Sequence, residues 1–217
     1  MSLEALFKAA VAELRKRDVL FAVAGGFAAA LYRDQPRLTL DVDLGIAAES
    51  AALETAVSVV ESIGLQAGIV READLVGGPL FAIRQGNTAP CIVVGRTPGE
   101  PSGNGVDILL PAIPWMADAI GRAQPNGVDF GFGTVPILTL EDVIISKLFA
   151  LRAVPIRAKD LDDLQSVFAA GHGIDRAYLS GQMRRFGIAV PPAAKAFLSR
   201  WIVAIARGNA RKGNATV

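Results

Sequence analysis

Several residue types are scarce in this 217-residue chain, and each scarcity excludes a class of site. The single cysteine, Cys91, rules out a disulfide within the chain and gives no support to an oxidising compartment. The single histidine, His172, excludes zinc centres that need two or three imidazole ligands. Any metal ion would therefore be held by carboxylates, which favour magnesium or manganese over zinc.

Long hydrophobic runs are missing as well. The longest, residues 19–32, falls short of the ~20 residues that span a bilayer and is interrupted by Gly25-Gly26. A secretory signal would place its apolar segment directly after a basic start, whereas here the basic cluster 15–17 follows an amphipathic helix. We therefore predict a cytoplasmic protein without a membrane segment.

The net charge of +1 conceals an uneven distribution of charged residues. Residues 1–150 carry 11 Lys and Arg against 17 Asp and Glu, whereas residues 151–217 carry 11 against 4. This pattern suits a protein whose carboxylates hold cations while its arginines meet a polyanion. Helices with solvated basic faces would account for the same charges equally well.

Hydrophobic periodicity predicts an α+β fold with a mixed or antiparallel sheet flanked by helices. The alternation of polar and apolar residues over 38–46 is typical of a strand with one buried face. The stretch 96–105 is rich in Gly, Pro and Ser and predicts a flexible loop. Further strands are expected at 19–24, 65–70, 80–84, 91–94, 106–110 and 128–132, and helices at 3–17, 27–32, 49–63, 114–123, 140–152, 159–170, 174–186 and 191–206.

The pattern becomes wholly helical from residue 139 onward. Thr139 and Asp142 form a T-x-x-D capping box at the start of that part. We therefore expect an α/β core over 1–138 and a helical C-terminal subdomain over 139–207. Residues 208–217 are polar, glycine-rich and basic, and we expect them to be disordered.

Gly25 and Gly26 lie between an expected strand and an expected helix. Such a turn exposes backbone N–H groups without side chains, which is what a phosphate needs at a helix N-terminus. The pair matches neither G-x-G-x-x-G nor G-x-x-x-x-G-K-[ST], so a dinucleotide site and a P-loop ATPase are disfavoured. A plain packing or turn role is the alternative.

Three aspartates form a candidate metal site, although a solvated edge strand would account for Asp41 and Asp43 equally well. Asp41 and Asp43 lie two positions apart, so they project from the same face of a strand. Like charges at that separation raise each other's pKa unless a cation lies between them. Asp107 stands inside the apolar run 106–110, where a carboxylate is costly without a partner. If the two strands pair, the three carboxylates can hold two divalent ions and promote phosphoryl or nucleotidyl transfer.

In this order the motifs resemble the nucleotidyltransferase superfamily that includes DNA polymerase β. The resemblance is to the AbiEii/AbiGii-type nucleotidyltransferases, the toxin component of a type IV toxin–antitoxin class. It rests on three sets of residues. They are Ala24-Gly25-Gly26 with Arg37-x-Thr39-x-Asp41-Val42-Asp43-Leu44, Asp107 in a later strand, and the helical signature of Thr139–Asp142, Ser146-Lys147-Leu148 and Lys159-Asp160-Leu161-x-Asp163.

The resemblance implies a role for each matching residue. Gly25 and Gly26 would position the nucleotide phosphates, and Lys147 would reach the triphosphate. Asp41, Asp43 and Asp107 would bind two Mg²⁺ or Mn²⁺ ions, with Asp107 also helping to deprotonate the acceptor hydroxyl. Thr39 and Arg37 flank the metal strand, and Arg37 either contacts phosphate or balances Asp41. Asp160 and Asp163 would organise their helix or pair with Arg152 or Arg157, or one of them would act at the site.

The sequence thus predicts an enzyme that transfers NMP from an NTP to a hydroxyl acceptor and releases pyrophosphate. By resemblance the acceptor is RNA, such as a tRNA end, and the protein is a toxin with a cognate antitoxin. A small-molecule (antibiotic) nucleotidyltransferase and a non-catalytic nucleotide-binding or antitoxin-like module remain as alternatives.

Overall fold

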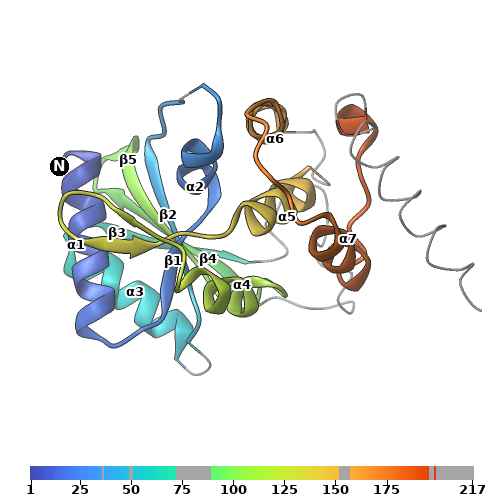
Figure 1. Ribbon diagram of the computed structural model, residues 1–217. Coiled ribbons are helices and arrows are strands. Elements are labelled where there is room, and N and C mark those ends of the chain that lie inside the picture. Colours follow the sequence, from blue (N-terminus) through green and yellow to red (C-terminus); the bar gives the residue numbers. More distant parts are fainter. Residues whose placement is uncertain (36, 49–50, 72–88, 152–156, 196–197, 199–217) are drawn as a thin grey trace, which may run out of the picture.

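The computed structural model describes residues 1–35, 37–48, 51–71, 89–151, 157–195 and 198 (Figure 1). The expected strand 80–84, the tail 208–217 and most of the expected helix 191–206 lie outside these residues. Within the described ranges, no helix has both the length and the apolar character that a membrane span needs.

A five-stranded mixed sheet forms the centre of the protein, as the sequence predicts. The strand order is β1-β2-β5-β4-β3. The β2–β5 pair is parallel, and the other neighbours are antiparallel. The strands are β1 (Phe21–Val23), β2 (Asp41–Ile46), β3 (Gln66–Arg71), β4 (Pro90–Thr97) and β5 (Glu100–Leu109).

Helices cover both faces of this sheet (Figure 1). On one face, α1 and α3 pack against apolar side chains of the central strands, such as the fully buried Val42 and Ile108. The helices α2, α4 and α5 lie on the other side, and α6 and α7 pack onto α5. The helices are α1 (Leu3–Lys16), α2 (Gly25–Tyr32), α3 (Ala52–Ser62), α4 (Met116–Ala123), α5 (Leu140–Ala150), α6 (Ala158–Ala169) and α7 (Arg176–Arg185).

The prediction of a flexible loop over 96–105 is wrong. This segment is a β-hairpin in which β4 runs to Thr97 and β5 starts at Glu100, and these two residues pair. Gly99 adopts a φ of +79° in the connection, a conformation that glycine reaches at no steric cost. Pro98 and Gly99 connect the two strands, whereas Gly103 and Gly105, which also suggest a loop, lie within the paired strand β5.

Two smaller differences concern strands. The expected strand 38–46 begins only at Asp41, and Leu40, which precedes it, is exposed rather than part of the core. The expected strand 128–132 is shorter and lies in a small second sheet, where β6 (Gly127–Asp129) pairs with β7 (Thr134–Pro136). Cys91, on β4, is buried.

The start of α5 carries a buried polar network. Thr139 caps the helix by accepting a hydrogen bond from the Asp142 backbone N–H, as the capping box predicts. The fully buried Asp142 carboxylate accepts hydrogen bonds from Arg122 at 2.8 Å and from the Tyr178 hydroxyl at 2.8 Å. This carboxylate therefore ties α4, α5 and α7 together.

We expect Asp142→Ala to lower the free energy of unfolding by about 2–4 kcal/mol, because it leaves Arg122 and the Tyr178 hydroxyl without their shared partner. Urea denaturation measures this loss. The matched control is Asp118→Ala, which removes an exposed ion pair with Arg185 and should cost less than about 1 kcal/mol. Equal losses in the two variants would contradict a structural role for the buried network.

Candidate active site

The parallel pairing of β2 with β5 brings the predicted carboxylates together. Asp43 stands directly opposite Asp107, and Asp41 stands opposite Gly105. The alternating residues Val42 and Leu44 point into the core. The three aspartates therefore share the face of the sheet that α1 and α3 leave uncovered.

The glycine pair lies against this cluster. The helix α2 starts at Gly25, whose φ is +55°, and the backbone N–H of Gly26 donates a 2.9 Å hydrogen bond to Asp43 Oδ2. A Cβ on Gly25 would overlap the Asp43 carboxylate, lying 2.7 Å from its Cβ. Glycine is therefore required at position 25 both by the backbone conformation and by the close approach of Asp43.

Burial and neighbouring carboxylates raise the pKa of Asp43 and of Asp107. Burial raises the pKa of Asp43 to about 6, and the charges of Asp107 and Asp41 add to this effect, while Lys147 and the Gly26 N–H oppose it. Burial also raises the pKa of Asp107, although the hydrogen bond and charge of Arg96 oppose this shift. The positive groups near Asp43 and Asp107 therefore do not fully offset the cost of burying these two carboxylates.

Arg96 on β4 is a site residue that the sequence analysis missed. Its Nη1 donates to Asp107 Oδ1 at 2.5 Å, and its Nη2 lies 3.3 Å from Asp41 Oδ1. The sequence predicts a loop over 96–105, and a loop prediction does not indicate that the Arg96 side chain lies beside the aspartates. A register prediction for the β4–β5 hairpin would have been needed to find it.

Lys147 on α5 lies in the wall of the site and is almost fully buried. Its Nζ is 2.8 Å from Asp160 Oδ1 and 2.7 Å from Asp163 Oδ2, both on α6. Arg157 Nε pairs with the other oxygen of Asp160 at 3.2 Å, which is one of the alternatives that the sequence leaves open. The two aspartates therefore hold the Lys147 ammonium in place.

Asp163 is fully buried and also binds two arginines. Arg37 contacts it through Nε at 2.9 Å and Nη2 at 3.1 Å, and Arg33 Nη1 lies 2.8 Å away. Burial would raise the pKa of Asp163, but the hydrogen bonds and charges of Arg37 and Lys147 outweigh it and lower that pKa. Arg37 thus balances Asp163 rather than Asp41.

The three aspartates of the sheet and Lys147 border a cavity of about 400 Å³, whereas Arg96 and Asp163 are not among its lining residues. All the predicted site residues line it except Gly25, which lies behind Asp43. Arg157 and Lys159 are exposed at the start of α6 and add positive charge to its border. Its lining consists of Gly26, Arg37, Leu38, Thr39, Leu40, Asp41, Asp43, Ile92, Asp107, Leu109, Ser146, Lys147, Ala150, Arg157, Lys159 and Asp160.

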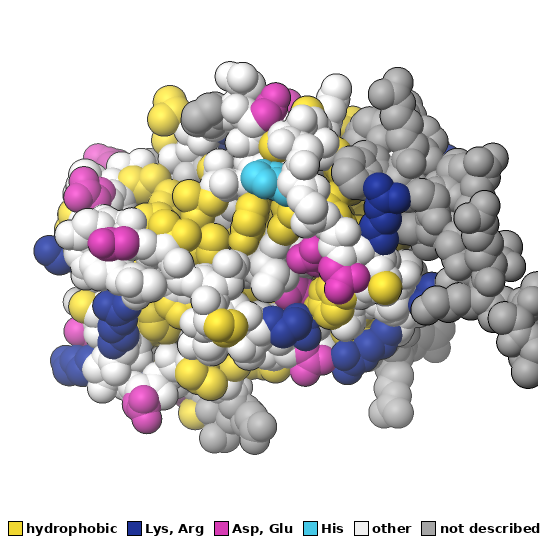
Figure 2. Space-filling model, viewed as in Figure 1, with side chains coloured by type: hydrophobic (Ala, Val, Ile, Leu, Met, Phe, Trp, Pro, Cys, Tyr) yellow, Lys and Arg dark blue, Asp and Glu magenta, His cyan; other side chains and the backbone are white. Residues whose placement is uncertain are grey.

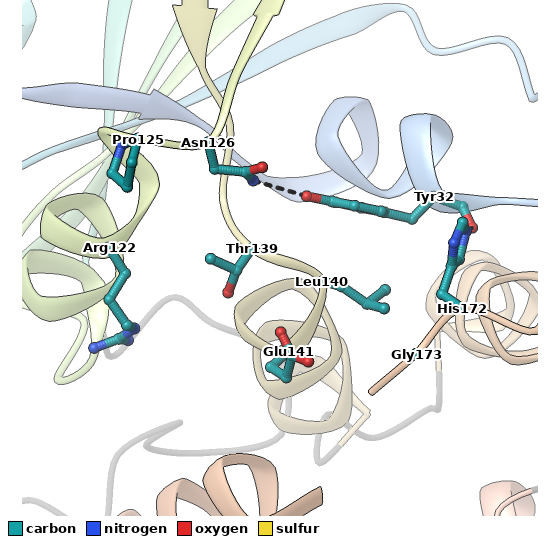
Figure 3. Close-up of a pocket in the computed structure, with 9 residues that line it drawn as sticks. All are labelled: Tyr32, Arg122, Pro125, Asn126, Thr139, Leu140, Glu141, His172 and Gly173. Carbon is teal, nitrogen blue, oxygen red and sulfur yellow. Dashed lines mark hydrogen bonds between the residues drawn. The ribbon is translucent and has the colours of Figure 1, made fainter. Parts of the chain in front are cut away.

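A second, more open pocket lies at the other end of α5, around Thr139 and Glu141 (Figure 3). Its polar groups bind within the protein: Asn126 donates to the Tyr32 hydroxyl at 2.9 Å, and His172 Nε2 lies 2.8 Å from the Tyr32 carbonyl oxygen. Figure 2 shows His172, the only histidine, exposed beside apolar side chains. These internal bonds indicate a structural role for the pocket.

The oxygen donors of the aspartates are those that Mg²⁺ and Mn²⁺ prefer. Among the described residues, however, no group of three or more Asp, Glu, His or Cys side chains is arranged to hold a metal ion. The Arg96 guanidinium lies between two of the three carboxylates. The donor chemistry therefore fits a divalent cation at Asp43 together with Asp41, while Arg96 already contacts Asp107 at 2.5 Å and Asp41 at the longer distance of 3.3 Å.

Comparison with solved structures identifies the class of fold. The antibiotic-resistance factor ANT(2'')-Ia, in complex with adenylyl-2''-tobramycin, is 18% identical and has a TM-score of 0.51 over 91% of this chain and 98% of that chain. This likeness shows that the fold is that of a nucleotidyltransferase.

Two further structures are similar at lower scores. Lincomycin-bound LnuA, a lincosamide antibiotic adenylyltransferase, is 14% identical, with a TM-score of 0.44 over 74% of this chain and 92% of that chain. A putative nucleotidyltransferase from H. pylori is 19% identical, with a TM-score of 0.45 over 93% and 80%.

Residues 9–190 match the family described as "Nucleotidyl transferase AbiEii toxin, Type IV TA system". The chain therefore belongs to the AbiEii nucleotidyltransferase toxin family and is an enzyme, as the sequence motifs predict. No curated protein matches it. The family assignment removes the support for a non-catalytic module.

We expect Asp43→Asn to stabilise the metal-free protein. Because the pKa of Asp43 is raised in the fold, the folded state binds more protons than the unfolded state between about pH 4 and 6, and stability falls as pH rises through that window. The amide removes this loss and can still accept the Gly26 hydrogen bond. Thermal unfolding at pH 8 in EDTA should give a higher Tm, by about 2–4 °C for each kcal/mol regained.

The control for this measurement is Asp118→Asn, which changes an exposed carboxylate in the same way and should leave Tm nearly unchanged. At pH 4 the advantage of Asp43→Asn should shrink, because Asp43 itself is then largely protonated. A Tm below that of the wild type at pH 8 would contradict the electrostatic account of the cluster.

We expect Gly25→Ala to weaken nucleotide binding at least about tenfold, because the added methyl group displaces Asp43 and strains the start of α2. Calorimetry with an NTP measures the effect. Gly121→Ala in α4 is the matched control, since its Cβ meets nothing within 4 Å. Unchanged affinity in Gly25→Ala would show that the glycine turn is not part of the nucleotide site.

Proposed function

We propose that the protein transfers a nucleoside monophosphate from an NTP to a hydroxyl acceptor with release of pyrophosphate, assisted by Mg²⁺ or Mn²⁺. The observation that carries the proposal is the register that sets Asp43 opposite Asp107, with the N-terminus of α2 in contact with Asp43. Carboxylates and helix N–H groups at one place suit a metal-bound triphosphate.

Each side of the cavity would serve a different part of the substrate. The N-terminus of α2 at Gly25 and Gly26 would bind phosphate oxygens, and Thr39 lies beside Gly26 to complete that side. From the opposite wall, Lys147 would face the β- and γ-phosphates. Its pairing with Asp160 and Asp163 orients the ammonium but limits how far it can move.

In the reaction, an acceptor hydroxyl oxygen attacks the α-phosphorus while the bond from that phosphorus to the bridging oxygen breaks. Pyrophosphate leaves, and the hydroxyl proton passes to Asp107. A bound divalent ion would neutralise phosphate charge and lower the pKa of the attacking hydroxyl. Asp41 and Asp43 would hold that ion.

The charges around the cavity favour an anionic acceptor such as RNA, including a tRNA end. Exposed Arg157 and Lys159 line the border, whereas the aspartates lie on the sheet below. Basic side chains at such a border contact nucleic-acid phosphates without reading their sequence. In this proposal the protein acts in the cytoplasm as a growth-arresting toxin that a cognate antitoxin controls.

We expect label from one of four α-labelled NTPs to appear on total RNA in the presence of Mg²⁺. Asp41→Ala should abolish the label while keeping the thermal unfolding profile, because it removes a metal ligand on the face of the sheet away from the α1–α3 core. Gel analysis of the RNA identifies the base and the labelled species.

The control is Asp118→Ala, an exposed change that should leave labelling intact. Parallel reactions with aminoglycosides and lincosamides test a small-molecule acceptor, and label on these with none on RNA would contradict the RNA proposal. Full activity of Asp41→Ala would contradict the proposed metal site.

A further inference from the structure

Arg96 holds an unusual position for a charged side chain in the middle of a sheet. It lies on β4 directly across from Gly105 on β5, and Gly105 in turn lies across from Asp41 on β2. Its guanidinium extends over the neighbouring strand and contacts both Asp107 and Asp41. The side chain thus bridges three adjacent strands.

A glycine on β5 leaves room for this guanidinium. A Cβ on Gly105 would overlap Arg96 Nη1 and lie 2.6 Å from the Gly95 carbonyl oxygen, so position 105 tolerates no side chain. Arg96 Nη1 also donates to that carbonyl oxygen at 2.9 Å. The guanidinium is therefore fixed by backbone as well as by carboxylates, and its exposed fraction is 24%.

The contacts of Arg96 are those of a metal ion that bridges two carboxylates. A guanidinium keeps its positive charge at all relevant pH values. A divalent ion could take this place only by breaking both partly buried ion pairs of Arg96. Asp43, by contrast, forms no ion pair among the described residues. Arg96 lies farther from Asp41, at 3.3 Å, than from Asp107, at 2.5 Å, so a cation bound at Asp43 and Asp41 would compete only with the longer of the two Arg96 contacts.

We propose that the Arg96 guanidinium serves as the second cation of the active site, so that the site takes up one divalent ion, at Asp41 and Asp43, instead of two. This rests on the proposed nucleotide site. Arg96 would then hold Asp107 in position beside the acceptor hydroxyl and supply the positive charge that a second ion would otherwise provide.

The test counts Mn²⁺ ions bound to the whole protein in the presence of an NTP analogue that cannot be cleaved at the α–β bridge. Equilibrium dialysis gives the stoichiometry, and electron paramagnetic resonance reports spin coupling between adjacent ions. We expect one ion per chain and an uncoupled spectrum for the wild type, and two ions with a coupled spectrum for Arg96→Met.

Two further variants complete the experiment. Arg96→Lys keeps a positive charge and should bind one ion, and Arg184→Met removes an exposed arginine of α7 and should also bind one. Circular dichroism checks that each variant is folded. If Arg96→Met is unfolded, the wild-type count and spectrum still decide the question.

Two coupled ions in the wild type would overturn this proposal and leave the proposed function standing. One ion in a folded Arg96→Met would also overturn it, since Arg96 would not be what excludes the second ion. No bound ion in any variant would overturn both the proposal and the metal site of the proposed function.

Discussion

The parallel pairing of β2 with β5 is the constraint on which the site depends, because it sets the Asp43 and Asp107 carboxylates opposite each other. Like charges this close to the core destabilise the fold unless donors or cations compensate them. Gly26 supplies a backbone donor to Asp43, and Arg96 supplies a cation to Asp107. The glycine turn and Arg96 therefore both offset the repulsion between the Asp43 and Asp107 carboxylates.

A second group of charges connects the helices α5 and α6 to the segment that follows α2. Asp163 on α6 binds Arg37 and Arg33, which follow α2, and Lys147 on α5. Removing one member of such a buried group would leave the others charged and unpaired, which is costly. The position of Lys147 is thus set by the packing of α6, so the helices contribute to the wall of the cavity as well as to the core.

The sequence could predict those parts of the site that depend on local patterns. The period-two spacing of Asp41 and Asp43 and the glycine pair between strand and helix are readable within a few residues, and both are in place in the structure. The roles of these residues in catalysis remain predictions. Arg96 and Asp163 could not be found in this way, since their partners depend on strand register and on helix packing between distant segments.

The hairpin of β4 and β5 shows why local composition gave a wrong loop prediction over 96–105. Glycines in a strand often signal a loop, yet Gly105 is needed within β5 because the Arg96 guanidinium lies over it. The same residue that lowers strand propensity makes the charged contact possible. A close tertiary contact of this kind overrides the local preference of the sequence.

Acidic and basic residues, which are unevenly distributed along the sequence, also occupy different parts of the cavity. Aspartates occupy the sheet, while Arg157 and Lys159 stand exposed at the border. In the proposed function, the border residues would attract the phosphates of a triphosphate, and the carboxylates would attract its divalent ion. A polycationic acceptor would meet repulsion from the border before reaching the aspartates, whereas a polyanion would be drawn towards them. This arrangement of charges supports the proposed nucleic-acid acceptor over a cationic small molecule.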